Sequence, residues 1–199
     1  MKAGAIILAG GKSSRMGTNK ALLTIDGKTN IERIRDELAV AFDNILVVAN
    51  DCESYHFLDV PIIQDQYPGK GPMAGIHAGL SASDFTVNFI VACDMPFISA
   101  KLATVLVNKS EGYDAVIPVI KGRQHPLFAV YKKSIMQDIQ LRLENDDLRI
   151  RDLLNKLNVR YVTEDELREH GGAELERVFF NMNHPDEYEN ARKWAETNL

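Results

Sequence analysis

The stretch AIILAGGKSSRMGTNK, residues 5–20, decides the fold class and gives the first indication of function. An apolar run with the length of a buried strand ends at two glycines, and the cations Lys12, Arg15 and Lys20 follow with no acidic residue among them. Glycine lets the backbone approach a ligand closely and adopt positive φ without steric cost. Because cations beside free backbone N–H groups form an anion site, we expect this loop to bind a polyphosphate.

Apolar runs of strand length alternate with segments of helical periodicity along most of the chain. Several of the runs are apolar throughout, which is typical of strands that are covered on both faces. This alternation predicts an α/β fold with a mostly parallel sheet, helices on both faces and right-handed crossovers. The predicted strands are Ala3–Ala9, Asn44–Ala49, Val60–Gln64, Val87–Cys93, Ala115–Val119, Leu127–Tyr131 and Val159–Thr163.

The predicted helices follow from apolar spacing and from start signals. Pro72 stands at an expected first helical position, and Ser134 with Gln137 has the S-x-x-Q form of a capping box. The charged segment 164–176 is predicted to be surface structure with a flexible turn. The predicted helices are Ile31–Phe42, Pro72–Ala82, Ser99–Lys109, Ser134–Leu143 and Pro185–Trp194.

Composition limits the class of protein. A chain of 199 residues with 45% apolar and 26% charged residues predicts a single globular domain over 1–199. The net charge of −5 argues against nucleic acid as a partner, because such proteins present a basic surface. Cys52 and Cys93 have no His or Cys neighbours at metal-ligand spacing, so we expect neither a zinc site nor a disulfide. We therefore expect the protein to be located in the reducing cytoplasm. No window approaches the ~20 apolar residues of a membrane helix, so no membrane partner is expected.

Two common phosphate loops are tested by spacing alone. A Walker A loop needs G-x-x-x-x-G-K-[ST], but Arg15 and Met16 stand five residues after Gly10 and Gly11. A dinucleotide fingerprint needs G-x-G-x-x-G, which the same glycines also fail. A P-loop NTPase and a Rossmann dehydrogenase are therefore disfavoured.

The pattern Leu8-Ala9-Gly10-Gly11-x-x-x-Arg15-Met16-Gly17-x-x-Lys20 resembles the loop of nucleotidyltransferases that make nucleoside-diphosphate sugars and related compounds. With Arg-Met-Gly and the lysine three residues on, the chain is most similar to the molybdenum cofactor guanylyltransferase family. Asn19 stands where that family often has Asp, and His184 where it often has Thr. The further motifs in family order are Val48-Ala49-Asn50, Asp65, Gly71-Pro72-Met73-Ala74-Gly75, Cys93-Asp94-Met95-Pro96, His125-Pro126 and Asn181-Met182-Asn183.

The resemblance implies a Rossmann-like three-layer α/β/α sandwich of the nucleotide-diphospho-sugar transferase type. It implies transfer of GMP from GTP to the terminal phosphate of molybdopterin, giving molybdopterin guanine dinucleotide and pyrophosphate. The product would pass to other cofactor-pathway proteins and molybdoenzymes. A cytidylyl- or sugar-1-phosphate nucleotidyltransferase of the same fold remains an alternative, and so does a non-catalytic nucleotide-binding regulator.

Three residues are predicted to be catalytic. Lys20 would place a point charge on the GTP phosphates, and Arg15 can grip a phosphate in bidentate fashion or instead pin the loop to the protein. Asp94 ends the apolar run 89–93, and a carboxylate at the mouth of a buried strand needs a partner. A helix N-terminus or backbone amide could serve, but the resemblance favours Mg²⁺, a hard cation that is usually held by one or two carboxylates with phosphate oxygens and water.

The remaining site residues are predicted from the same motifs. Asp65 would accept hydrogen bonds from guanine, or be an ordinary loop aspartate, and Asn50 could pair with base or ribose or with its own backbone. His125 is assigned to the acceptor side of the site and not to acid–base catalysis. The predicted GTP-binding residues are Leu8, Ala9, Gly10, Gly11, Lys20, Asn50, Asp65, Gly71 and Asp94; those for molybdopterin are His125, Asn181 and Asn183.

Overall fold

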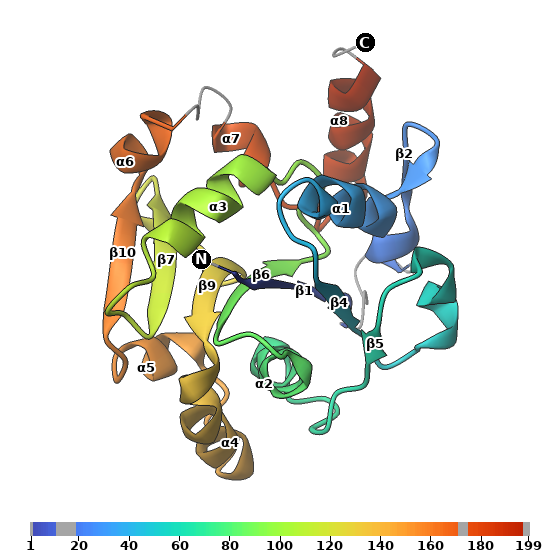
Figure 1. Ribbon diagram of the computed structural model, residues 1–199. Helices are drawn as coiled ribbons and strands as arrows, with labels where there is room; N and C mark the ends of the chain where they lie inside the picture. The colour runs from blue at the N-terminus through green and yellow to red at the C-terminus, as the bar shows by residue number, and fades with distance from the viewer. Residues whose placement is uncertain (1, 11–18, 171–174, 197–199) are drawn as a thin grey trace.

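A computed structural model describes residues 2–10, 19–170 and 175–196, and is built on an eight-stranded central sheet (Figure 1). Its strand order is β10-β7-β9-β6-β1-β4-β5, with β8 paired to β7. A separate two-stranded hairpin, β2 with β3, lies outside it. The strands are β1 (Gly4–Leu8), β2 (Thr24–Ile25), β3 (Lys28–Thr29), β4 (Ile45–Val48), β5 (Ile62–Ile63), β6 (Val87–Ala92), β7 (Ala115–Ile120), β8 (Arg123–Gln124), β9 (Phe128–Lys132) and β10 (Val159–Thr163).

The sheet is mostly parallel, as the alternating pattern predicts. β1 pairs in parallel with both β4 and β6, β4 with β5, and β7 with β10, whereas β9 is antiparallel to β6 and β7. The register places Leu8 beside Val48 and Ala92, so three neighbouring strands end at one edge of the sheet. The loops that leave this edge carry most of the predicted site residues.

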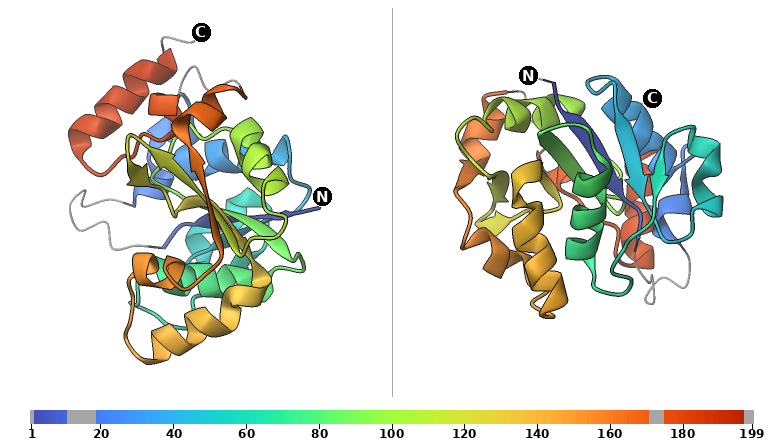
Figure 2. Two further views of the ribbon diagram at one scale, coloured as in Figure 1. Left: turned by 90° about the vertical axis from the view of Figure 1, so that its left-hand side faces the viewer. Right: turned by 60° about the horizontal axis from the view of Figure 1, so that its bottom comes forward.

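Helices cover both faces of the sheet, so the three-layer prediction is confirmed (Figures 1 and 2). One face packs on α1, α3, α6 and α7, and the opposite face on α2, α4 and α5. The helices are η1 (Lys20–Leu22), α1 (Asn30–Ala39), η2 (Glu53–Leu58), α2 (Pro72–Ala82), α3 (Ala100–Asn108), η3 (Lys133–Ile135), α4 (Met136–Glu144), α5 (Ile150–Leu154), α6 (Glu164–Arg168), α7 (Leu175–Val178) and α8 (Pro185–Glu196). Among the described residues, no helix is long and apolar enough to cross a membrane.

Two helix starts differ from expectation. The chain enters α4 through the 3-10 turn η3, which contains Ser134, so this serine does not cap the helix and the predicted capping box is wrong. The turn itself satisfies the first N–H groups, since Met136 N donates to Lys133 O. Segment 164–176 begins with helix α6, where Thr163 and Glu166 form a capping box that was not predicted.

Close packing of α2 on β1 depends on a glycine. A Cβ on Gly79 would lie 2.5 Å from Ile6 Cγ2, closer than two carbon atoms can approach. Gly71, just before the helix, has φ of 71° and ψ of −160°, a conformation that residues with a side chain rarely adopt. Glycine at these two positions therefore fixes both the start of α2 and its distance from the sheet.

Candidate active site

Three predicted site residues from distant parts of the sequence meet at the carboxyl edge of the sheet. Lys20 Nζ donates a 2.9 Å hydrogen bond to Asn183 Oδ1. Met182 N, in the same segment as Asn183, donates to Asp94 O at 2.8 Å. Lys20 also acts on Asp94 through its charge. The structure thus brings together the cation, the carboxylate and one of the predicted acceptor-side amides.

The Asp94 carboxylate is an electrostatically perturbed group. Burial raises its pKa above the ordinary value, and the negative charge of Glu187 raises it further. The Lys20 cation and the backbone N–H of Asp94 lower the pKa and so favour the ionised form. Because a buried carboxylate is stabilised by added positive charge, this position favours a bound cation.

The turn that carries Lys20 is tied to the end of β1 through Asn19 and Tyr55. Asn19 Oδ1 accepts from Ala21 N at 3.1 Å and caps η1, while Asn19 Nδ2 donates to Tyr55 Oη at 2.8 Å. Tyr55 Oη in turn donates to Ala9 O at 3.3 Å. An aspartate at position 19 could accept from Ala21 N but could not donate to Tyr55. Asn19, which departs from the family pattern, therefore makes a bond to Tyr55 that an aspartate could not donate.

Backbone groups at the end of β1 form hydrogen bonds to the neighbouring strand segments. Cys93 N donates to Leu8 O at 3.0 Å, and Ala9 N donates to Val48 O at 2.9 Å. Gly10 is exposed, and a Cβ there would meet no atom of the described residues within 4 Å. The predicted residues Gly11 and Arg15, like Lys12, lie outside the described residues.

Local bonds form the turn at Asp65, and Lys70 ties the end of this loop to Leu143 O and Asp146. The local part is centred on Asp65. Its Oδ1 accepts from Tyr67 N at 2.7 Å, and Lys70 N donates to Tyr67 O at 3.2 Å. The Tyr67 ring packs edge-on against buried His77 at 5.3 Å between centroids. Asp65 Oδ1 thus forms an Asx turn, so the predicted guanine contact would have to be made by Oδ2.

The other predicted binding residues are more scattered. Asn50 is exposed two residues beyond β4. The His125 ring packs on Phe179 at 4.6 Å between centroids, and burial with the nearby Arg123 charge lowers its pKa to about 4. A neutral, aromatic-packed histidine agrees with its exclusion from the catalytic set. Asn181 is half-buried beside Met182.

Sequence reasoning missed Asn30 and Glu187. Glu187 Oε2 accepts from Asn183 N and His184 N and so caps the start of α8, the role that a threonine at position 184 would share. Asn30 is fully buried and donates through Nδ2 to Cys93 O at 2.5 Å. A signal was present in the sequence, since Asn30 continues the apolar stripe of Ile34 and Leu38 at four-residue spacing.

Asp94 is the predicted metal ligand, and no group of three His, Cys, Asp or Glu side chains able to hold a metal ion occurs in the described part of the chain. A single partly buried carboxylate suits Mg²⁺, which binds one or two carboxylates and takes its remaining ligands from phosphate oxygens and water. The donor set therefore fits a metal that arrives with a nucleotide, but not a permanent metal centre made of protein ligands alone.

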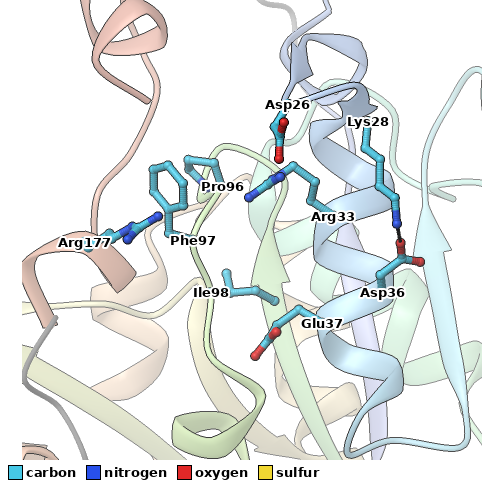
Figure 3. A pocket seen from close by; sticks show the side chains of 9 residues that line it. All are labelled: Asp26, Lys28, Arg33, Asp36, Glu37, Pro96, Phe97, Ile98 and Arg177. Carbon is cyan, nitrogen blue, oxygen red and sulfur yellow. Dashed lines mark hydrogen bonds and ion pairs between the residues drawn. The ribbon is translucent and has the colours of Figure 1, made fainter. Parts of the chain in front are cut away.

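A surface cavity of 620 Å³ lies beyond the Asp94 loop, between that loop and α1 (Figure 3). Its charges are largely engaged: Lys28 pairs with Asp36 at 2.6 Å, and Glu37 Oε1 accepts from Ala100 N at 2.8 Å. Figure 3 shows Arg177 along the Phe97 ring, 4.4 Å from its centroid. The cavity includes none of the predicted site residues; it is lined by Asp26, Lys28, Arg33, Asp36, Glu37, Pro96, Phe97, Ile98 and Arg177.

Comparison with known proteins agrees with the geometry. The family model of the MobA-like NTP transferase domain matches residues 5–161, which include Lys20, Asp65 and Asp94. The chain belongs to this family. A MobA-like relative from Pelotomaculum thermopropionicum, named a probable molybdenum cofactor guanylyltransferase, is 37% identical over 98% of this chain and 95% of its own length.

Solved structures extend the MobA-like assignment to the fold. Molybdopterin-guanine dinucleotide biosynthesis protein A from Archaeoglobus fulgidus superposes with a TM-score of 0.85 at 28% identity, covering 98% of this chain and 99% of that one. 2-C-methyl-D-erythritol 4-phosphate cytidylyltransferase from Thermus thermophilus reaches 0.70 at 16% identity over 98% and 100%, which shows a shared fold alone. The predicted family and nucleotidyltransferase fold are confirmed.

Proposed function

We propose that this protein transfers GMP from GTP to the terminal phosphate of molybdopterin, giving molybdopterin guanine dinucleotide and pyrophosphate. The observation that carries the proposal is the meeting of Lys20, Asp94 and Asn183 at the carboxyl edge of the sheet. Ligands of open α/β sheets bind at this edge. The names of the MobA-like relatives supply the two substrates, and the charges of the site suit a phosphoryl-group reaction.

The nucleophile in this reaction is a phosphate that is already anionic, so the protein needs no general base. The terminal phosphate of molybdopterin attacks the α-phosphorus of GTP, a new P–O bond forms, and the bond to pyrophosphate breaks in line. Lys20 donates to phosphate oxygens as negative charge builds on them, which stabilises the transition state more than the bound substrate. For this, Lys20 exchanges its amide partner Asn183 for phosphate.

Asp94 would hold Mg²⁺ together with the nucleotide phosphates. The bound ion would supply positive charge that stabilises the α-phosphate and the leaving pyrophosphate. The arrangement of the chain supports this role, because Asp94 is partly buried and the charge of Lys20 acts on it. Arg15 would add a bidentate phosphate contact, and Gly10, Gly11 and Gly71 would leave room for the nucleotide backbone contacts.

On the acceptor side, Asn183 is the predicted residue that the geometry supports best. Its amide lies at Lys20, so a phosphate bound there can reach both side chains. We place His125 and Asn181 farther along the same surface, where His125 would present a neutral ring beside Phe179. Asp65 and Asn50 would contact the guanine and ribose of GTP.

The decisive experiment follows pyrophosphate release by the pure protein with Mg²⁺, molybdopterin and each nucleoside triphosphate in turn. We expect turnover with GTP and little with CTP or ATP. Preferred use of CTP would identify a cytidylyltransferase of the same cofactor. Turnover with sugar 1-phosphates or methylerythritol phosphate in place of molybdopterin would identify the other alternative, and nucleotide binding without any transfer would identify a regulator.

A further inference from the structure

Asn30 connects the two segments that carry the charged residues of the site. Its backbone N–H donates to Leu23 O at 2.8 Å, at the end of the turn that begins with Lys20. Its side-chain Nδ2 donates to Cys93 O at 2.5 Å, in the residue directly before Asp94. One buried residue at the start of α1 therefore bonds to both the Lys20 turn and the Asp94 loop.

The bond to Cys93 O completes a set of contacts around the peptide that leads into Asp94. Cys93 N donates to Leu8 O at 3.0 Å, and Asp94 O accepts from Met182 N at 2.8 Å. With Asn30 on Cys93 O, the groups on both sides of the Cys93–Asp94 peptide are held from three different elements. Long-range contacts thereby hold the backbone from which the Asp94 side chain projects.

Stability alone does not explain an asparagine at this position. Asn30 is 0% exposed, and its Oδ1 is buried without a hydrogen-bond partner among the described residues, which costs free energy. The position belongs to the apolar stripe that continues through Ile34 and Leu38, where an aliphatic side chain would remove the unpaired Oδ1. What the amide provides, and an aliphatic side chain cannot, is the N–H donor on Cys93 O.

We propose that Asn30 is a positioning residue that fixes the Asp94 loop relative to the Lys20 turn, so that both charges act on the same phosphates. The effect of Asn30 on catalysis rests on the proposed function, whereas its role in holding the Asp94 loop does not. The residue contacts no substrate itself. Its role is to keep the Cys93–Asp94 peptide in one orientation while ligands bind and leave.

The test uses Asn30→Leu and the smaller Asn30→Ala, with Asn88→Leu and Asn88→Ala as matched controls. Asn88 is also 0% exposed, and its Nδ2 donates to a main-chain oxygen, Phe85 O, at 2.9 Å. It lies near the opposite end of β6, away from the site. Each pair of variants therefore removes one buried amide from a buried position, but only the Asn30 pair releases the Asp94 loop.

Two readouts are measured on all four proteins and the wild type. Amide hydrogen exchange at Met182, whose N–H bonds to Asp94 O, is expected to become about tenfold faster in the Asn30 variants and to stay unchanged in the Asn88 variants. In the transfer assay, kcat is expected to fall about tenfold or more in the Asn30 variants, with KM for GTP within about twofold, because misalignment affects the transition state most.

Several outcomes would overturn the proposal. Met182 exchange in the Asn30 variants that equals the value in the Asn88 variants would show that Asn30 does not hold the loop. A kcat that follows only the fraction of folded protein, equally in both pairs, would show a purely structural role. If the wild type transfers no nucleotide to any acceptor, the proposed function fails, and Met182 exchange still decides whether Asn30 positions the loop.

Discussion

The loop after β6 and the loop after β5 each contain an aspartate close to the end of the strand, yet the two are built in different ways. The Asp94 loop is held by contacts from distant parts of the chain: Asn30 on Cys93 O, and Met182 on Asp94 O. At Asp65 the carboxylate itself forms a local turn with Tyr67 N, and the long-range bonds of that loop are made by Lys70, to Leu143 O and Asp146. The difference is that long-range contacts hold the peptide that leads into Asp94, whereas the Asp65 side chain is itself part of a local turn.

The largest effect is expected from loss of Asp94 or of Lys20. Asp94→Ala and Lys20→Ala should each lower guanylyl transfer by about 10²-fold or more, because each removes a contact that strengthens in the transition state. Steady-state pyrophosphate release measures the loss. The exposed residues Asp84 and Lys101 provide matched controls, and their alanine variants should keep wild-type rates. Wild-type turnover by folded Asp94→Ala protein would show that Asp94 is not the ligand of a catalytic Mg²⁺.

A substitution in the Asp65 loop should lower the transfer rate less, and it should affect the choice of nucleotide. In Asp65→Asn the amide oxygen can still accept from Tyr67 N, so the turn survives while the charge is lost. If the carboxylate binds guanine, kcat/KM for GTP should fall about tenfold, in line with a hydrogen bond to a charged group. Measurement of GTP against ATP separates recognition from general damage. Unchanged GTP preference would leave Asp65 as a turn residue only.

The sequence predicts the strands and the layers well, because these follow from apolar periodicity, and it indicates a candidate site from the loops that leave strand ends. It also predicts Lys20 and Asp94, whose charges stand out beside apolar runs. It does not predict their supports. The apolar stripe of Ile34 and Leu38 indicates that Asn30 is buried, but only the fold places its amide against Cys93 O, 63 residues away. The failed capping box at Ser134 has a similar cause, because tertiary entry through η3 overrides a local pattern.

A third prediction concerns the hydroxyl group that links η1 to β1. Tyr55→Phe removes the group that accepts from Asn19 Nδ2 and donates to Ala9 O, so the turn carrying Lys20 loses a tether. Loss of about 1 kcal/mol of hydrogen bonding should raise the KM for GTP about fivefold. Tyr131→Phe is the control, since its hydroxyl also donates to a main-chain oxygen and is also buried. It should lower stability while leaving the KM for GTP unchanged; an equal rise in both variants would contradict the tether.

The smallest effect should appear as pH dependence at the Asp65 loop. His77 lies under Tyr67, and burial lowers its pKa below the ordinary 6.5, while the Asp65 charge opposes this shift. As pH falls below 6.5, the unfolded chain binds a proton at this residue before the folded protein does. The free energy of unfolding should therefore decrease with falling pH through this window, and the neutral form should be the one that stabilises the fold above it.

Urea unfolding of the wild type and His77→Gln between neutral and mildly acidic pH measures the effect. The wild type should lose more stability than the variant, and the difference isolates His77 from His125, whose pKa of about 4 makes the same contribution in both proteins. Removing the Asp65 charge in Asp65→Asn should lower the pKa of His77 further and so extend the decline to lower pH. Parallel curves for wild type and His77→Gln would show that His77 is protonated as readily in the fold as in the unfolded chain. The Asp65 loop would then not depend on a neutral histidine beneath Tyr67.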